Sequence, residues 1–317
     1  MKKAGLFTLD KKPKRGLLAA EWVIMGYLAF TLLMMVFMWP RLISPETMLL
    51  GRCRYVVVTF GMWALYRAVP CKLTILARIA VQLGFLGWWY ADTFELNRLL
   101  PNLDHVFAAW EQSLFNCQPS LLFSQALPDG WFSELMCLGY VSYFPLIATV
   151  TIYYFIQRYQ EFEMATFVIL TSFFAYYIIF ILLPVTGPQF YYLAVGTENI
   201  AAGTFPDIGN WFMTHSERMA APGWTDGFFY HLLEIAHNTG ERPTAAFPSS
   251  HVGITTVLIL LALRTRSRWL VLFILPFFIL MCLATVYIHA HYAIDVLAGL
   301  ATGILFYYAS CALYKRI

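Results

Sequence analysis

Charged residues are scarce in this sequence. Only 12% of its 317 residues are charged, whereas 60% are hydrophobic. Soluble domains carry about 25% charged and about 45–50% apolar residues, because a surface in water needs polar cover. The aromatic share of 18% is typical of chains whose Trp and Tyr side chains lie at a membrane interface. The composition therefore predicts an integral membrane protein with the bilayer as its solvent.

The sequence also lacks the motifs that are typical of zinc-binding proteins and of nucleic-acid-binding proteins. The sequence has no CxxC pair and no zinc-like spacing, and no basic segment interleaved with aromatics indicates a nucleic-acid partner. The cysteines are scattered, and because most lie in apolar runs we expect buried free thiols. They are Cys53, Cys71, Cys117, Cys137, Cys282 and Cys311. The sequence thus predicts no metal site, no cofactor and no nucleic-acid partner.

Eight apolar segments are candidate transmembrane helices, each of which needs about 20 residues. In chain order they are Gly16–Trp39, Arg54–Val69, Leu73–Tyr90, Trp131–Ile156, Met164–Leu183, Pro248–Leu263, Trp269–Ile288 and Tyr292–Tyr314. Arg67 and Arg78 lie at or inside the ends of the second and third segments, so a six-span arrangement without these two stays open. We expect an all-α polytopic bundle with six core helices. Residues 1–70 would add an N-terminal cytoplasmic tail and two further helices.

Basic residues mark the cytoplasmic side of membrane proteins. The N-terminal tail carries Lys2, Lys3, Lys11, Lys12, Lys14 and Arg15. With eight spans, the other basic clusters fall on the same side, near residues 67–78, 157–163, 264–268 and the C-terminus. We therefore expect a cytoplasmic N-terminus. The short tails, which carry no eukaryotic retention signal, favour a bacterial inner membrane.

Two long segments, 92–130 and 185–247, fall on the opposite side of the membrane, which is the periplasm or an organelle lumen. Loops of this length in a compact protein are usually functional or disordered, and the aromatic residues in both segments argue against disorder. The first contains an amphipathic stretch at Asp104–Asn116. We expect both segments to lie on the membrane surface and to form a lid.

Three ionisable residues, His251, His291 and Asp295, lie where the sixth and eighth spans begin. The hairpin of the sixth and seventh spans brings both histidines to one depth on the outer side. Asp295 follows His291 by four residues, so both share a helix face. A hydrogen bond from imidazole to carboxylate would fix the tautomer. His291 is then suited to act as a nucleophile or base, and His251 as a general acid.

Other interpretations of these residues stay open. A histidine near a helix end is often a solvated interfacial residue, and His289 fits that description. A metal site of His289, His291 and Asp295 has suitable ligand types, but positions i and i+2 of a helix point in different directions. A lipid-binding or transport protein belongs to another class. Transporters often show inverted repeats and broken helices, and the sequence shows neither.

At these residues the sequence resembles the type 2 phosphatidic acid phosphatase (PAP2) superfamily. The stretch Phe247–Gly253 resembles its second motif, and His291–Asp295 matches the His-x-x-x-Asp of its third. The run His289–Val296 is especially similar to the sphingomyelin and inositol phosphorylceramide synthase branch. The resemblance covers residues 165–314 and implies a catalytic membrane domain over residues 71–317.

The resemblance also implies a mechanism. His291 would attack phosphorus to form a phosphohistidine, and Asp295 would orient it. His251 would protonate the departing alkoxide and then help to deprotonate the acceptor, with no metal needed.

The sequence departs from the phosphatases of this superfamily where they carry cations. The place of their first motif is Pro184–Gln189, which has no arginine, and Ala284 and Thr285 replace their Ser-Arg pair. A phosphate monoester carries about −1.5 to −2 charges, whereas a phosphodiester carries one. Fewer cations therefore favour a diester donor. We expect transfer of a phospho-head group, such as phosphoinositol, from a phospholipid to a ceramide-like hydroxyl; the alternative is a lipid phosphatase acting on a monoester or pyrophosphate.

Candidate substrate-binding residues surround these motifs. They are Gly187, Pro188, Gln189, Arg242, Ser249, Ser250 and Tyr292. Arg242, just before the second motif, is a candidate for the one remaining cation, and a solvated loop arginine is an equally good interpretation. Gly187 and Pro188 are expected to shape a loop that closes over the site.

Overall fold

The computed structural model describes residues 5–10 and 12–317. Lys2, Lys3 and Lys11, part of the predicted basic tail, lie outside the described residues. Over the described residues the fold is all-helical, with one isolated β-bridge between Leu9 and Cys71. The predicted all-α fold class is thereby confirmed.

Among the described residues, six helices are long and apolar enough to cross a membrane. They are α1 with η1 (Ala19–Arg41), α2 (Pro45–Ala68), α3 with α4 (Lys72–Asn97), α9 (Tyr159–Leu182), α14 (Arg268–Tyr287) and α15 (Ala293–Tyr314). A seventh span is the pair α7 (Gly130–Val141) and α8 (Tyr143–Gln157), which is bent by 47°. The apolar helix α13 (Ser250–Arg264) is shorter, at 15 residues. Because α2 and α3–α4 both qualify, the structure does not support the six-span arrangement that omits them.

Small residues bring α13 and α15 into close contact. A Cβ atom on Gly303 would lie 2.5 Å from the carbonyl oxygen of Gly253, and one on Gly299 would lie 2.6 Å from that of Ser249. Close backbone approach of this kind is a usual packing device between transmembrane helices. The hydroxyl of Ser249 also caps α13 by accepting a hydrogen bond from the Val252 N–H at 3.4 Å. This packing fixes the start of α13 against the first turn of α15.

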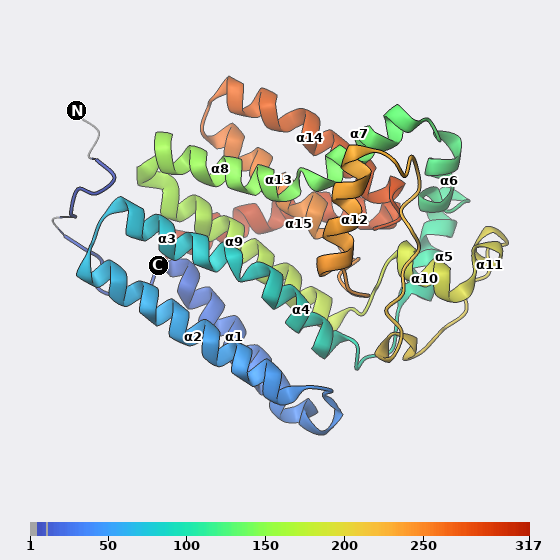
Figure 1. Cartoon of the computed structure of the whole chain (residues 1–317), viewed down its shortest axis with the longest axis horizontal. Coiled ribbons are helices and arrows are strands. Elements are labelled where there is room, and N and C mark those ends of the chain that lie inside the picture. The colour runs from blue at the N-terminus through green and yellow to red at the C-terminus, as the bar shows by residue number, and fades with distance from the viewer. Residues whose placement is uncertain (1–4, 11) are drawn as a thin grey trace.

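The elements that do not span the membrane gather at one end of the bundle, opposite the end where both termini lie (Figure 1). They are α5 (Asp104–Phe115), α6 (Pro119–Ala126), α10 (Pro188–Val195), α11 (Thr197–Ala201), η2 (Trp211–Met213) and α12 (Phe228–Gly240). The predicted amphipathic stretch is the helix α5. The predicted start of the first outer segment at residue 92 is wrong, because α4 (Leu86–Asn97) continues to Asn97.

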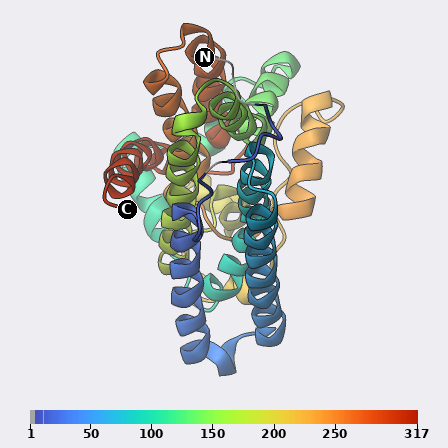
Figure 2. The ribbon, with the colours of Figure 1, turned by 90° about the vertical axis from the view of Figure 1, so that its left-hand side faces the viewer.

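The two N-terminal helices are joined to the rest of the bundle by packing and by buried charge pairs. Helix α1 packs against α9, and α2 packs against α3 (Lys72–Gly84). Figure 2 shows these helices from the end that carries both termini. Arg52 of α2 donates two hydrogen bonds of 2.7 Å to Asp92 of α4. Arg78 of α3 pairs in the same way with Glu21 of α1. The buried arginines of these two spans, Arg52 and Arg78, are therefore paired with carboxylates on neighbouring helices.

The cysteines only partly follow the prediction. All six are free thiols, but only Cys71 and Cys137 are buried, and Cys53 on α2 is exposed. The other three are half-buried. An exposed Cys53 is compatible with an apolar run because its side chain lies on a helix face that the bilayer can cover.

Candidate active site

The structure brings His251 and His291 together. His251 lies in the first turn of α13, and His291 lies in the turn between α14 and α15. Their ring centroids are 5.7 Å apart, in an edge-to-face arrangement. Both rings line one cavity of about 180 Å³, together with Ser250. The hairpin of α13 and α14 thus delivers two imidazoles to a single chamber.

His291 is oriented by a backbone carbonyl. Its Nδ1 lies 2.8 Å from the carbonyl oxygen of Ala246 and 3.5 Å from Asp295 Oδ2. Nδ1 therefore carries the proton and donates to Ala246, which leaves Nε2 with a free lone pair. The carboxylate of Asp295 instead accepts a hydrogen bond from the Tyr292 N–H at 2.8 Å. Asp295 thereby fixes the backbone that follows His291, and its direct contact with the imidazole is the longer one.

Burial sets the charge of His291. The side chain is only 4% exposed, and this burial lowers the pKa of His291 to about 4, against the opposing effects of the Ala246 carbonyl and Glu241. The imidazole is consequently neutral at pH 7, which is the state that a nucleophile requires.

His251 is held between two tyrosine rings. Tyr140 of α7 stacks on it at 4.6 Å between centroids, and Tyr143 of α8 lies at 4.3 Å. The bend between α7 and α8 places these two rings on the imidazole. Within the described part of the chain, Nδ1 of His251 has no hydrogen-bond partner. The ring is thus fixed by packing while a nitrogen stays available for proton exchange.

A buried carboxylate, Asp104, supports the turn that carries His291. It accepts hydrogen bonds from the Thr186 N–H at 2.7 Å and hydroxyl at 2.9 Å, from the Gly187 N–H at 2.8 Å, from the Tyr292 hydroxyl at 3.0 Å and from Asn102 at 2.6 Å. Gly187 has φ 92°, and a Cβ there would lie 2.6 Å from the Ala290 carbonyl oxygen. Asp104 of α5 therefore holds both the 184–189 loop and the residue next to His291.

Two other buried groups lie near the turn that carries His291. Glu111 of α5 accepts a hydrogen bond from the Ile294 N–H at 3.1 Å, and burial raises the pKa of Glu111 to about 8. His289 does not line the cavity; its Nε2 lies 3.4 Å from the Ser124 hydroxyl. Its carbonyl accepts a hydrogen bond from the Gln189 N–H at 2.8 Å. Among the residues with described positions, no three His, Cys, Asp or Glu side chains are placed to share a metal ion.

The predicted substrate-binding residues take different positions. Ser250 is the only one of the seven that lines the cavity with both histidines. Gly187 lies in the supporting loop and Pro188 and Gln189 begin α10, while Ser249 caps α13 and Tyr292 bonds to Asp104. Arg242 is exposed, donates to the Glu241 carbonyl at 3.0 Å, and lines a neighbouring polar cavity instead. No arginine or lysine thus borders the chamber of His251 and His291 among the described residues.

Sequence reasoning missed Glu241 and His237, which line both cavities. Oε1 of Glu241 accepts a hydrogen bond from Gln189 Nε2 at 3.1 Å. Burial raises the pKa of the Glu241 carboxyl, and the neighbouring His291 opposes that shift. A signal was present: residues 234, 237, 238 and 241 are spaced by three and four, so they share one helix face.

The chain belongs to the PAP2 superfamily, whose model matches residues 105–309. It is therefore a multi-pass protein of a superfamily of membrane lipid phosphatases and phosphotransferases. One solved structure with a detectable likeness is the first transmembrane PAP2 type phosphatidylglycerolphosphate phosphatase from Bacillus subtilis. It is 14% identical, with a TM-score of 0.38, and the alignment covers 75% of this chain and 96% of that one. No curated protein matches the chain.

The predicted superfamily is thus confirmed. Its sphingolipid synthase branch stays a prediction, as do the roles of His251, His291 and Asp295, the orientation in the membrane and the bacterial source.

Proposed function

We propose that this protein is a phosphotransferase that moves a phospho-head group from a phospholipid to the hydroxyl group of a second, ceramide-like lipid. The observation that carries the proposal is the lining of the catalytic cavity. Glu241 is its only acidic residue, and none of the described residues around it is a lysine or an arginine. A phosphate bound at His291 therefore touches no lysine or arginine of the described lining, because Arg218 and Arg242 line only the neighbouring cavity.

The missing cations discriminate between substrates by charge. One cation about 5 Å from a unit charge contributes about 3 kcal/mol at an effective dielectric constant of about 20. A monoester with about two negative charges loses roughly twice as much from the absence of that cation as a diester with one. The cavity is therefore better suited to a phosphodiester lipid than to a terminal phosphate.

Apolar residues on the other side of the cavity suit the lipid part of the substrate. Leu86 of α4, Phe144 of α8 and Phe173 of α9 line it. Phe144 is 66% exposed, and it lies on a span whose surroundings are lipid. Acyl chains can therefore stay in the bilayer while the phosphate reaches His291.

The geometry supports a two-step transfer. In the first step Nε2 of His291 attacks phosphorus, the bond from phosphorus to the diacylglycerol oxygen breaks, and His251 donates a proton to that oxygen. In the second step His251 takes the proton of the acceptor hydroxyl, its oxygen attacks phosphorus, and the phosphorus–nitrogen bond breaks. Asp295 holds the first turn of α15, so the imidazole keeps its direction through both steps.

The test supplies purified protein in detergent micelles with phospholipid donors and ceramide, and follows the lipids by mass spectrometry. We expect a phospho-head-group ceramide and diacylglycerol in equal amounts. His291→Asn should abolish both products, while the control His289→Asn, outside the cavity, should keep more than about half of the rate. Release of phosphate from phosphatidic acid, with no transfer from any donor, would replace this proposal with the lipid phosphatase.

A further inference from the structure

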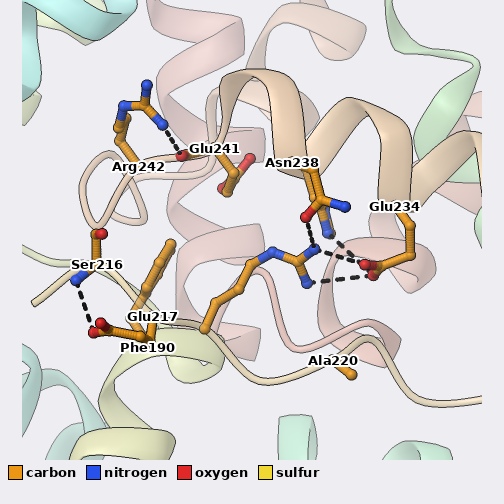
Figure 3. A pocket seen from close by; sticks show the side chains of 10 residues that line it. Phe190, Ser216, Glu217, Ala220, Glu234, Asn238, Glu241 and Arg242 are labelled. Carbon is orange, nitrogen blue, oxygen red and sulfur yellow. Dashed lines mark hydrogen bonds and ion pairs between the residues drawn. The ribbon is translucent and has the colours of Figure 1, made fainter.

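A second cavity, of about 380 Å³, adjoins the catalytic one. The two share a wall made by His237 and Glu241. One side of the second cavity is α12, from which Glu234 and Asn238 project, and the other is the segment that carries Ser216 and Glu217 (Figure 3). Its volume lies within the range of about 300–1,000 Å³ that is usual for small-molecule sites.

Of the two arginines in the described lining of this cavity, Arg218 is paired with a carboxylate and Arg242 is not. Arg218 donates to Glu234 at 2.7 and 3.3 Å, to Asn238 Oδ1 at 3.0 Å and to the Met219 carbonyl at 3.0 Å. Arg242 is exposed and bonded to the Glu241 carbonyl. Glu217, Glu234 and Glu241 bring three carboxylates to the lining. The described lining thus carries one more carboxylate than guanidinium groups, which disfavours an acidic head group.

His237 lacks the partners that its burial demands. The side chain is 3% exposed, and neither ring nitrogen has a hydrogen-bond partner among residues 5–10 and 12–317. A buried polar group without a partner costs about 1–3 kcal/mol, so a ligand or water in the cavity is needed to satisfy it. Burial lowers the pKa of His237 to about 4. The neutral ring presents one donor and one acceptor, and two hydroxyl groups could pair with them, one at each nitrogen.

We propose that this second cavity binds the head group of the phospholipid donor, and that it selects a neutral polyol. Its described lining mixes acceptors, on the three carboxylates, with donors on Ser216, Asn238 and His237. A quaternary ammonium group favours an aromatic cage, and Phe190 is the one carbocyclic aromatic side chain in this lining. A donor lipid would lie across the shared wall, with its phosphorus beside His291. This site rests on the proposed function, because the head group it binds is the one transferred.

The binding test uses soluble diesters and does not depend on turnover. We would measure the melting temperature of the His291→Asn protein in detergent with glycerophosphoinositol, glycerophosphoethanolamine and glycerophosphocholine. A rise is expected with the inositol probe alone, and Asn238→Leu, added to His291→Asn, should remove it. Asn199→Leu, at an exposed asparagine outside both cavities, is the matched control. An equal or larger rise with the ethanolamine or choline probe overturns the polyol assignment.

The kinetic test separates this site from the proposed function. With phosphatidylinositol as donor, Asn238→Leu should raise KM about fivefold, as expected for one lost hydrogen bond, while kcat stays within about twofold. Glu234→Gln weakens the hold on Arg218 and should shift preference toward an anionic donor such as phosphatidylserine. If both variants are active transferases with unchanged KM and donor preference, the second cavity does not bind the head group. If the inositol probe binds and needs Asn238, but the protein transfers no head group, the binding site is supported and the proposed transferase activity is wrong.

Discussion

Substitution of Asp104 by asparagine is the sharpest test of how the turn that carries His291 is supported. The carboxylate accepts two hydrogen bonds on Oδ1 and three on Oδ2. An amide nitrogen cannot accept a hydrogen bond, so Asp104→Asn loses at least two of these hydrogen bonds. The new amide N–H groups would also face the N–H or O–H donors that bonded to the lost oxygen. Hydrogen bonds to a charged group contribute about 1.5–3 kcal/mol each. The loss is therefore about 3–6 kcal/mol before the loop relaxes.

That loss should appear chiefly in kcat. Relaxation moves Gly187 and Tyr292, and a displacement of about 1 Å in a catalytic group costs about 100-fold in rate. The residues of the two cavities do not include Asp104, so KM for the donor should change only a few-fold. The assay is lipid turnover by mass spectrometry, with thermal melting to verify the fold. Asp207→Asn, at an exposed side chain at the same end of the bundle, is the control. If folded Asp104→Asn keeps more than about a third of wild-type kcat, the supporting role is wrong.

Three further outcomes are expected. Arg52→Met should lower the free energy of unfolding by about 3–5 kcal/mol with kcat within about twofold, and adding Asp92→Leu should restore most of it; equal stability of single and double variants would contradict the buried pair. Thermal stability should decline as pH falls from about 6.5 to 4, because the unfolded chain protonates buried histidines whose pKa is about 4. His289→Gln should make the melting temperature fall less steeply with pH, and an unchanged slope would contradict this role of His289. Since the pKa of Glu111 is raised to about 8, Glu111→Gln should stabilise the protein above pH 8 and change little at pH 5, as melting curves would show.

The sequence was a good guide where span length fixes geometry. His251 and His291 each begin an apolar helix on one side of a hairpin, so their depth follows from counting residues. The helix boundaries were less predictable. The predicted start of the second span at Arg54 is nine residues late, because Arg52 looks incompatible with a bilayer until Asp92 is seen beside it.

The surroundings of the catalytic turn were harder to predict. Asp104 and Glu111 lie on an amphipathic helix, where carboxylates normally face water. Only the fold reveals that both face inward. Asp104 bonds to residues 82 and 188 positions further along the chain, and Glu111 to a residue 183 positions further along. The partner of the His291 imidazole, the Ala246 carbonyl, has no side-chain signature at all. Backbone acceptors of this kind are invisible to motif reasoning.

The buried charge pairs of the N-terminal helices also bear on how the protein is made. Arg52 and Asp92 are 40 residues apart in the chain, and Glu21 and Arg78 are 57 apart. During synthesis α1 and α2 therefore reach the insertion machinery before their partners exist. An unpaired charge at the centre of a membrane helix costs about 2.5–3.5 kcal/mol on insertion scales, a cost that bears on Arg52 within α2 more than on Glu21 in the first turn of α1. The first two helices are consequently held in place by the third span, α3 with α4. Their charged residues can be paired only after that span has been made.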